Sequence, residues 1–200
     1  MMNEIETARL YLRQFKAGDL DDLYPIFNDP EVVKYMKAVL PVSREETERA
    51  LLSIIEHWKR HGFGRWAVTD KETRRLIGYG GLRSLDGMPE LVYLLDKPFW
   101  GRGLATELAL DCLKWGFDDR HFERVVAITR PEHTASRRVM EKIGMTYERD
   151  ARYQEINVVQ YCISRETFQS LALLKQMPLV CLADSNPRRR PTEHTTLRDG

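Results

Sequence analysis

The chain has 200 residues, of which 42% are hydrophobic, 30% charged and 10% aromatic. This is the composition of a folded soluble domain, so disorder as the main state is excluded. Lysine and arginine number 31 against 30 aspartate and glutamate residues, so the net charge is close to zero. A chain without an overall positive field is a poor candidate for general nucleic-acid binding.

The chain begins with an acidic stretch that lacks the positive and apolar regions of a secretory signal. Its most apolar stretch, 171–183, is interrupted by Lys175 and Pro178, so we expect no membrane span and a cytoplasmic location. The three cysteines are odd in number and far apart, without the spacing of zinc ligands, and we expect reduced packing residues and no metal site: Cys112, Cys162 and Cys181.

Hydrophobic periodicity in the first half predicts a strand, two helices and then an antiparallel meander. The second helix has a strong start signal, the capping box Ser43 to Glu46, and Gly62 ends it. The expected strands are 9–13, 65–69, 76–82 and 90–95, and the first helix runs from Gly18-Asp19 through Phe27.

After Gly103 the pattern predicts a helix, a β-branched strand at 125–129, a short helix stopped by Gly144, and two final strands at 146–153 and 156–164. About seven strands with helices between them favour an α/β fold with one mixed, mostly antiparallel sheet covered by helices on both faces. We expect one domain over 1–177 and a flexible C-terminal tail over 178–200.

The most informative segment is Trp100-Gly101-Arg102-Gly103-Leu104-Ala105-Thr106-Glu107, which lies between a predicted strand and a predicted helix. Glycines allow close approach of a ligand to the backbone, and the first helical turn offers unpaired N–H groups. Such a junction suits a pyrophosphate. It is neither a Walker A loop nor the dinucleotide fingerprint, because the required Lys-Ser/Thr and third glycine are absent.

This segment resembles the Gln/Arg-x-x-Gly-x-Gly/Ala loop of the GNAT superfamily of acetyl-CoA-dependent N-acetyltransferases, in the form of its RimJ/RimL branch. Residues 133–145, His-Thr-Ala-Ser followed by Glu-Lys-Ile-Gly-Met, are similar to that branch's Asn-x-x-Ser…Glu-Lys-x-Gly-Phe helix. Residues 7–13 and 28–32 also resemble the branch, so the resemblance covers roughly residues 5 to 168.

The resemblance implies that the fourth and fifth strands splay apart and that the pantetheine of acetyl-CoA lies against the gap. Its pyrophosphate is then expected on the amides of residues 101–106, and an amide of Leu94 or Leu95 is expected to face the thioester. We therefore expect this cofactor site: Leu94, Leu95, Trp100, Gly101, Arg102, Gly103, Leu104, Ala105, Thr106 and His133.

Three positions depart from the family pattern. Pro98 stands where the loop has glutamine or arginine, which removes a side-chain contact and a backbone donor. His133 replaces asparagine but can still donate or accept a hydrogen bond. Met145 for phenylalanine changes packing only.

Acetyl transfer needs a neutral amine, donors for the developing oxyanion and a proton for the departing thiolate. Many superfamily members use a tyrosine as proton donor, but Met140 occupies that position here. The resemblance makes Ser136 the candidate donor, with capping of its own helix as the alternative. Glu90 is the candidate base, acting through a water, with an exposed glutamate at a strand end as the alternative.

Glu155 and Tyr161 are weaker candidates for the acceptor side, and His57 with His61 is better explained by a solvated or groove-lining face than by a metal pair. We expect an N-acetyltransferase whose acceptor is a protein N-terminus or a small amine. The only acidic cluster between 27 and 61 is Glu45, Glu46 and Glu48, which disfavours polycationic acceptors.

A non-catalytic module that binds CoA as a sensor or scaffold is the alternative function, supported by the departures at Pro98 and His133. The apolar segment 171–182 is a candidate surface for a homodimer. Arg188-Arg189-Arg190 fits either a solvated terminus or a contact with RNA or an acidic partner.

Overall fold

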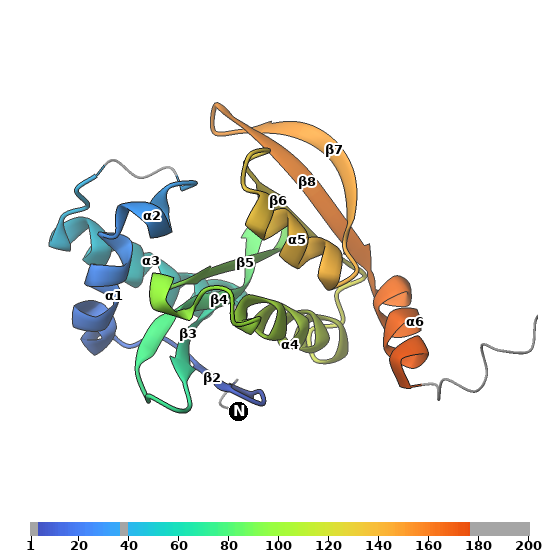
Figure 1. Ribbon diagram of the computed structural model, residues 1–200, viewed down its shortest axis with the longest axis horizontal. Coiled ribbons are helices and arrows are strands. Elements are labelled where there is room, and N and C mark those ends of the chain that lie inside the picture. The colour runs from blue at the N-terminus through green and yellow to red at the C-terminus, as the bar shows by residue number, and fades with distance from the viewer. Residues whose placement is uncertain (1–3, 37–39, 177–200) are drawn as a thin grey trace, which may run out of the picture.

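The computed structural model describes residues 4–36 and 40–176, which form one eight-stranded sheet in the order β1-β2-β3-β4-β5-β6-β8-β7 (Figure 1). The strands are β1 (Ile5–Glu6), β2 (Leu10–Arg13), β3 (Arg65–Asp70), β4 (Leu76–Leu85), β5 (Met88–Leu95), β6 (Arg124–Thr129), β7 (Thr146–Tyr153) and β8 (Ile156–Ser164). Seven were expected from the sequence. The eighth, β1, has only two residues and is too short to show a periodicity.

The expected mixed sheet is confirmed. Strands β1 to β5 are antiparallel neighbours, and β6, β8 and β7 form a second antiparallel group. The two groups meet between β5 and β6, which are parallel and are paired at a single register position, Glu90 with Val126. The expected splaying of the fourth and fifth predicted strands therefore lies between β5 and β6.

Six α-helices accompany the sheet within the described residues: α1 (Leu20–Phe27), α2 (Pro30–Val33), α3 (Arg44–His61), α4 (Leu104–Asp118), α5 (Thr134–Lys142) and α6 (Arg165–Gln176). Four were expected, and the two additional ones are α2 and α6. The capping box of α3 is present, with the Ser43 hydroxyl accepting from the Glu46 amide and the Glu46 carboxylate accepting from the Ser43 amide. Gly62 ends this helix at φ +69°, a left-handed conformation that glycine adopts without strain.

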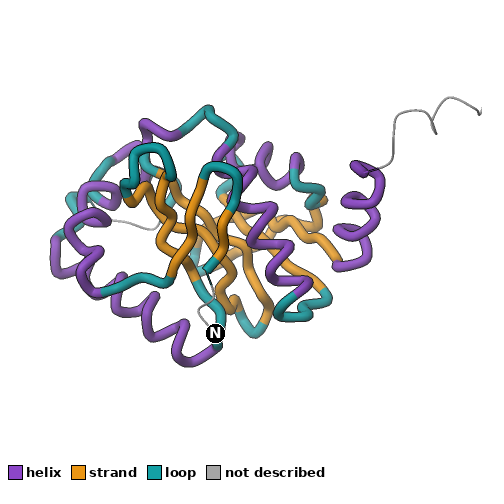
Figure 2. The backbone as a smooth tube through the Cα atoms, turned by 90° about the horizontal axis from the view of Figure 1, so that it is seen from below, coloured by secondary structure: helices purple, strands orange, loops and turns teal. Residues whose placement is uncertain are grey.

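Helices cover both faces of the sheet (Figures 1 and 2). On one face α1 packs on β4, where Phe27 and Tyr79 meet edge to face with ring centroids 6.1 Å apart. On the other face α4 lies directly against Gly80, because a Cβ atom there would be 2.5 Å from the Leu108 side chain. The helices α4 and α5 lie on this same face and contact each other.

The described chain ends with α6, which contacts β8. Leu171 packs close to Gly144, whereas Leu173 and Leu174 are exposed. The expected tail at 178–200, its arginine run and Cys181 lie outside the described residues. In the described part of the chain, none of the helices has the length and apolar character needed to cross a membrane.

Candidate active site

The junction between β5 and α4 forms an anion cradle, by which we mean the backbone of Gly101 to Thr106. Gly101 has φ +72° and Gly103, the N-cap of α4, has φ +76°. The first intrahelical bond runs from the Glu107 amide to the Gly103 carbonyl at 3.1 Å, so the amides of residues 104–106 have no carbonyl of their own helix to bond. These amides and the positive end of the helix dipole favour an anion at this position.

The two glycines leave space in front of these amides. A Cβ atom on Gly101 would meet no atom within 4 Å, and one on Gly103 would meet only the Arg9 guanidinium at 3.7 Å. Glycine is therefore required here for its positive φ and not by crowding from the protein itself. Because residues 101 and 103 are glycines, no side chain fills the space in front of the amides. That space suits an anion such as the diphosphate of a CoA thioester.

The N-terminal strand holds the cradle in place through Arg9 and Glu107. The Glu107 carboxylate accepts hydrogen bonds from the Arg9 amide at 2.7 Å, the Arg9 Nε at 2.6 Å and the Thr7 hydroxyl at 2.6 Å. Arg9 Nη1 donates to the Arg102 carbonyl at 2.8 Å. Burial alone would raise the pKa of Glu107, but these hydrogen bonds and the Arg9 charge lower it. Sequence reasoning assigned Arg9 and Glu107 no role, although both lie in segments that resemble the family.

Pro98 does not disturb the cradle. It lies in the 3₁₀ turn η2 (Lys97–Phe99), in the first positions, where an amide has no partner within the turn. The turn itself therefore does not need the backbone donor that Pro98 lacks, and its effect on cofactor binding stays a prediction. Trp100, two residues further on, is exposed and donates from its indole Nε1 to the Leu95 carbonyl at 2.6 Å.

The gap between β5 and β6 leaves one edge of β5 open beyond Glu90. The Asp96 amide donates to the Ile77 carbonyl of β4, so the alternation of an antiparallel ladder directs the Leu94 amide toward β4 and those of Tyr93 and Leu95 toward the gap. The bond from Trp100 to the Leu95 carbonyl agrees with this direction. Of the two residues expected to supply an amide, Leu95 is the one that faces the gap.

Ser136 lies in the first turn of α5 and is buried. Its hydroxyl is 3.0 Å from the Tyr93 hydroxyl, which is also 3.1 Å from the Ser136 carbonyl. This contact, across the gap to β5, places Ser136 beside the open edge. Burial raises the pKa of Tyr93 to about 12, so this phenol stays protonated at neutral pH. Sequence reasoning missed Tyr93, because a tyrosine at an inward strand position is most often core.

His133, expected at the cofactor site, is the N-cap of α5. Its ring stacks on Tyr35 at 4.0 Å between centroids, and Nδ1 is 3.1 Å from the Thr129 hydroxyl. Burial lowers the pKa of His133, so the imidazole is neutral at pH 7. Its contacts join the segment after α2 to the end of β6.

Glu90 is buried and does not lie at a strand end, so the exposed alternative is wrong. The strand β5 begins at Met88, and the β4–β5 ladder extends back to the pair Leu85 and Met88, which places Glu90 opposite Arg83. The Arg83 Nε donates to the Glu90 carboxylate. Burial raises the pKa of Glu90 above its usual value, and Arg83 partly opposes that effect. Glu90 faces the α1 side of the sheet, opposite to Tyr93.

The weaker candidates have other roles. Tyr161 is buried, accepts from Arg137 Nε at 3.1 Å and donates to the Glu141 carboxylate at 3.0 Å, so it fixes α5 on β8. Met140 is buried and packs in the core. His57 accepts from the Ser84 amide at 3.1 Å and its other ring nitrogen contacts the Phe63 carbonyl at 2.9 Å, so both nitrogens bond to backbone.

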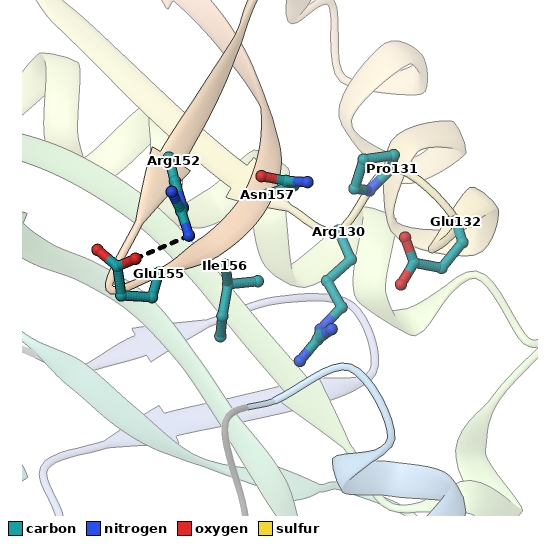
Figure 3. Close-up of a pocket in the computed structure, with 7 residues that line it drawn as sticks. All are labelled: Arg130, Pro131, Glu132, Arg152, Glu155, Ile156 and Asn157. Atoms are coloured by element: carbon teal, nitrogen blue, oxygen red, sulfur yellow. Dashed lines mark ion pairs between the residues drawn. The ribbon is translucent and has the colours of Figure 1, made fainter.

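Glu155 lies in the turn between β7 and β8 and forms an ion pair with Arg152 at 2.7 Å. Figure 3 shows both residues at the tip of this hairpin, beside a pocket of about 380 Å³ whose opposite wall is the loop after β6. The lining residues are Arg130, Pro131, Glu132, Arg152, Glu155, Ile156 and Asn157.

Comparisons with known proteins agree with this arrangement. Residues 9–146 match the family model of the acetyltransferase (GNAT) domain. An uncharacterized N-acetyltransferase of Bacillus licheniformis, p20, is 30% identical over 151 residues, which cover 74% of this chain and 84% of p20. A solved GNAT-family acetyltransferase from Bacillus anthracis has 26% identity and a TM-score of 0.71, covering 82% of this chain and 99% of its own.

The structural neighbours include the ribosomal L7/L12 alpha-N-protein acetyltransferase RimL, solved in complex with coenzyme A. It has 18% identity and a TM-score of 0.70 and covers 81% of this chain and 98% of its own. At this identity the comparison establishes a common fold. The resemblance to the GNAT superfamily that the sequence suggested is confirmed by the match to the family model over residues 9–146.

Replacing Arg9 by alanine is expected to lower the free energy of unfolding by about 1 to 2 kcal/mol, because it removes two charge-assisted donors from the cradle. The change Arg102→Ala is the control. Its partner Glu72 is 3.6 Å away and exposed, and we expect a loss within about 0.5 kcal/mol. Urea denaturation of both variants measures the difference.

The sign of the pH dependence follows from the lowered pKa of Glu107. The contacts of the Glu107 carboxylate stabilise the fold fully above the pKa of Glu107 in the unfolded chain, near 4.5. This stabilisation is lost as the pH falls through the lower pKa that Glu107 has in the folded protein. The difference in free energy of unfolding between wild type and Arg9→Ala should therefore shrink at acid pH. A difference that grew as the pH was lowered would contradict this role of the ion pair.

Proposed function

Because the chain belongs to the GNAT acetyltransferase family, we propose that it moves the acetyl group of acetyl-CoA to a primary amine, a protein N-terminus or a small molecule, directly within a ternary complex. The observation that carries the proposal is the placement of the anion cradle at one end of the open β5 edge and of Ser136 beside that edge. One site binds an anion, and the other can protonate a leaving group nearby.

In this proposal the cradle amides hold the diphosphate, with Trp100, Arg102 and His133 as further contacts along the cofactor. The Leu95 amide donates to the thioester oxygen, where negative charge develops during attack, and so lowers the barrier. The coenzyme A complex of RimL supports this assignment of the cofactor. Acetyl-CoA supplies the activated acetyl group, and no metal has a role in the proposal.

The proton balance uses two groups on opposite faces of β5. The attacking amine forms the new C–N bond and loses a proton through water to Glu90, whose raised pKa makes it a better base than an exposed glutamate. The C–S bond breaks, and the departing thiolate takes a proton from the Ser136 hydroxyl, which recovers one from solvent, while Glu90 releases the proton of the amine to solvent. Tyr93 donates its own hydrogen bond to Ser136 and remains protonated.

Changing Gly103 to aspartate is expected to abolish binding of acetyl-CoA, because the side chain enters the space before the cradle amides and adds a negative charge there. The matched control is Gly87→Asp, another positive-φ glycine, with φ +84° and open space around its Cβ position, in the turn between β4 and β5. Calorimetric titration should show binding by the control and none by Gly103→Asp. Undiminished binding by a folded Gly103→Asp protein would contradict the cradle assignment.

A free-thiol assay with acetyl-CoA tests the proposed activity, with peptides bearing N-terminal alanine or serine and small amines as acceptors. Ser136→Ala is expected to lower kcat about tenfold to a hundredfold, because general-acid assistance to the thiolate is lost. Tyr93→Phe should lower kcat by a smaller factor, and both should leave KM for acetyl-CoA within about threefold. Thr134→Ala, which removes an exposed hydroxyl from the same helix, is the control.

Cofactor binding without thiol release on any acceptor would favour the alternative, a CoA-binding sensor. An unchanged kcat in Ser136→Ala would remove this serine from the chemistry while leaving the transferase proposal intact.

A further inference from the structure

A cluster of charged and aromatic side chains lies on the α1 face of the sheet, on the same face as Glu90. We call it the arginine cluster: Arg65, Tyr79, Arg83, Glu90 and Tyr153. Arg83 is paired with Glu90 and lies over the Tyr153 ring at 6.0 Å. The cluster therefore joins β3, β4 and β5 to the tip of the β7–β8 hairpin.

The charges in this cluster do not balance. Two guanidinium groups face one carboxylate, and that carboxylate is bonded to Arg83. The Arg65 guanidinium lies 5.4 Å from the centre of the Tyr79 ring, which is an uncharged partner. Burial above all, and then the neighbouring Arg83, lower the pKa of Arg65, while Tyr79 and the more distant charge of Glu90 partly oppose this effect. Asp86, the nearby acid that also affects Glu90, is exposed in the β4–β5 turn.

A cation removed from water without a matching anion costs free energy, and a protein keeps such an arrangement where a ligand supplies the missing charge. Arg65 and Arg83 are both partly exposed as residues, and 29% of the Arg83 side chain remains accessible to solvent. His57, which is also close, adds no charge because its Nε2 accepts from the Ser84 amide.

The pocket at the hairpin tip also contains an arginine with an uncharged partner, although its two arginines are matched in number by Glu132 and Glu155. Arg130 donates from Nε to the Tyr35 carbonyl at 3.2 Å, again an uncharged partner, while Arg152 is paired with Glu155. In Figure 3 the Arg130 side chain extends from the loop after β6 toward the segment that follows α2. By the strand register, Arg65 lies on the side of the sheet where Glu90 faces.

We infer that the amine acceptor carries a carboxylate, and that Arg65 binds this carboxylate while the amine lies near Glu90. This inference rests on the proposed function and names the substrate class for it. It also extends the sequence argument against polycations, because the arginine cluster has two guanidinium groups and one carboxylate. A polyamine would bring its second ammonium group next to Arg65.

The test compares two acceptors of equal length, 4-aminobutyrate and 1,4-diaminobutane, and two peptides, Ser-Asp and Ser-Asn amides, in the thiol assay. We expect kcat/KM at least tenfold higher for the acidic member of each pair. In Arg65→Gln the ratio of kcat/KM for the acidic acceptor to kcat/KM for its partner should fall toward one. The variant Arg65→Lys should restore part of this ratio. Arg124→Gln, which breaks an ion pair at the far end of β6, is the control and should keep the ratio.

Thermal unfolding separates binding from a structural role. Because Arg65 has no paired anion, Arg65→Gln should be at least as stable as wild type. A variant that loses stability and keeps the ratio would overturn the inference, as would a preference of the wild type for the neutral or cationic acceptor.

Calorimetry with CoA-loaded protein keeps the inference testable if thiol release fails with every acceptor. Tighter binding of 4-aminobutyrate than of 1,4-diaminobutane would support the acidic acceptor although the transferase proposal had failed. Equal or weaker binding would contradict it.

Discussion

The single register pair between β5 and β6, Glu90 with Val126, is the constraint on which the rest of the site depends. Up to that point the sheet is closed, and beyond it the edge of β5 is open to a ligand. An open edge inside a sheet leaves peptide groups that need partners, which is costly for a strand and useful in a binding site. The cradle at the end of β5 and Ser136 across the gap both derive their position from this divergence.

Residues next to the N-terminal strand β2 hold the cradle loop in position. Glu107 lies in the first turn of α4, where its negative charge would oppose an anionic ligand, and Arg9 and Thr7 hold this carboxylate on the side of β2. The same arginine bonds the Arg102 carbonyl of the cradle. Residues separated by nearly half of the chain therefore set one loop, and in the proposed function this loop binds its ligand through backbone amides.

The sequence predicted a mixed sheet, the succession of seven strands along the chain and the boundaries of β7 and β8, because alternation and turn residues are local signals. Local signals also placed the Gly101 and Gly103 loop. They could not show that Glu90 is buried, since the contact with Arg83 depends on how far the β4–β5 ladder extends. Sequence reasoning also missed two contacts for the same reason, Arg9 with Glu107 and Tyr93 with Ser136. Each pair joins residues far apart in the chain, and neither partner alone has an unusual pattern.

Amide chemical shifts of the ¹⁵N-labelled protein, titrated with coenzyme A, test the central claim most directly. The account predicts large shifts for the amides of Leu95, Leu104 and Ala105 and little change for Leu94, whose amide faces β4. Shifts confined to other parts of the sheet, with Leu95 and the cradle unaffected, would contradict it.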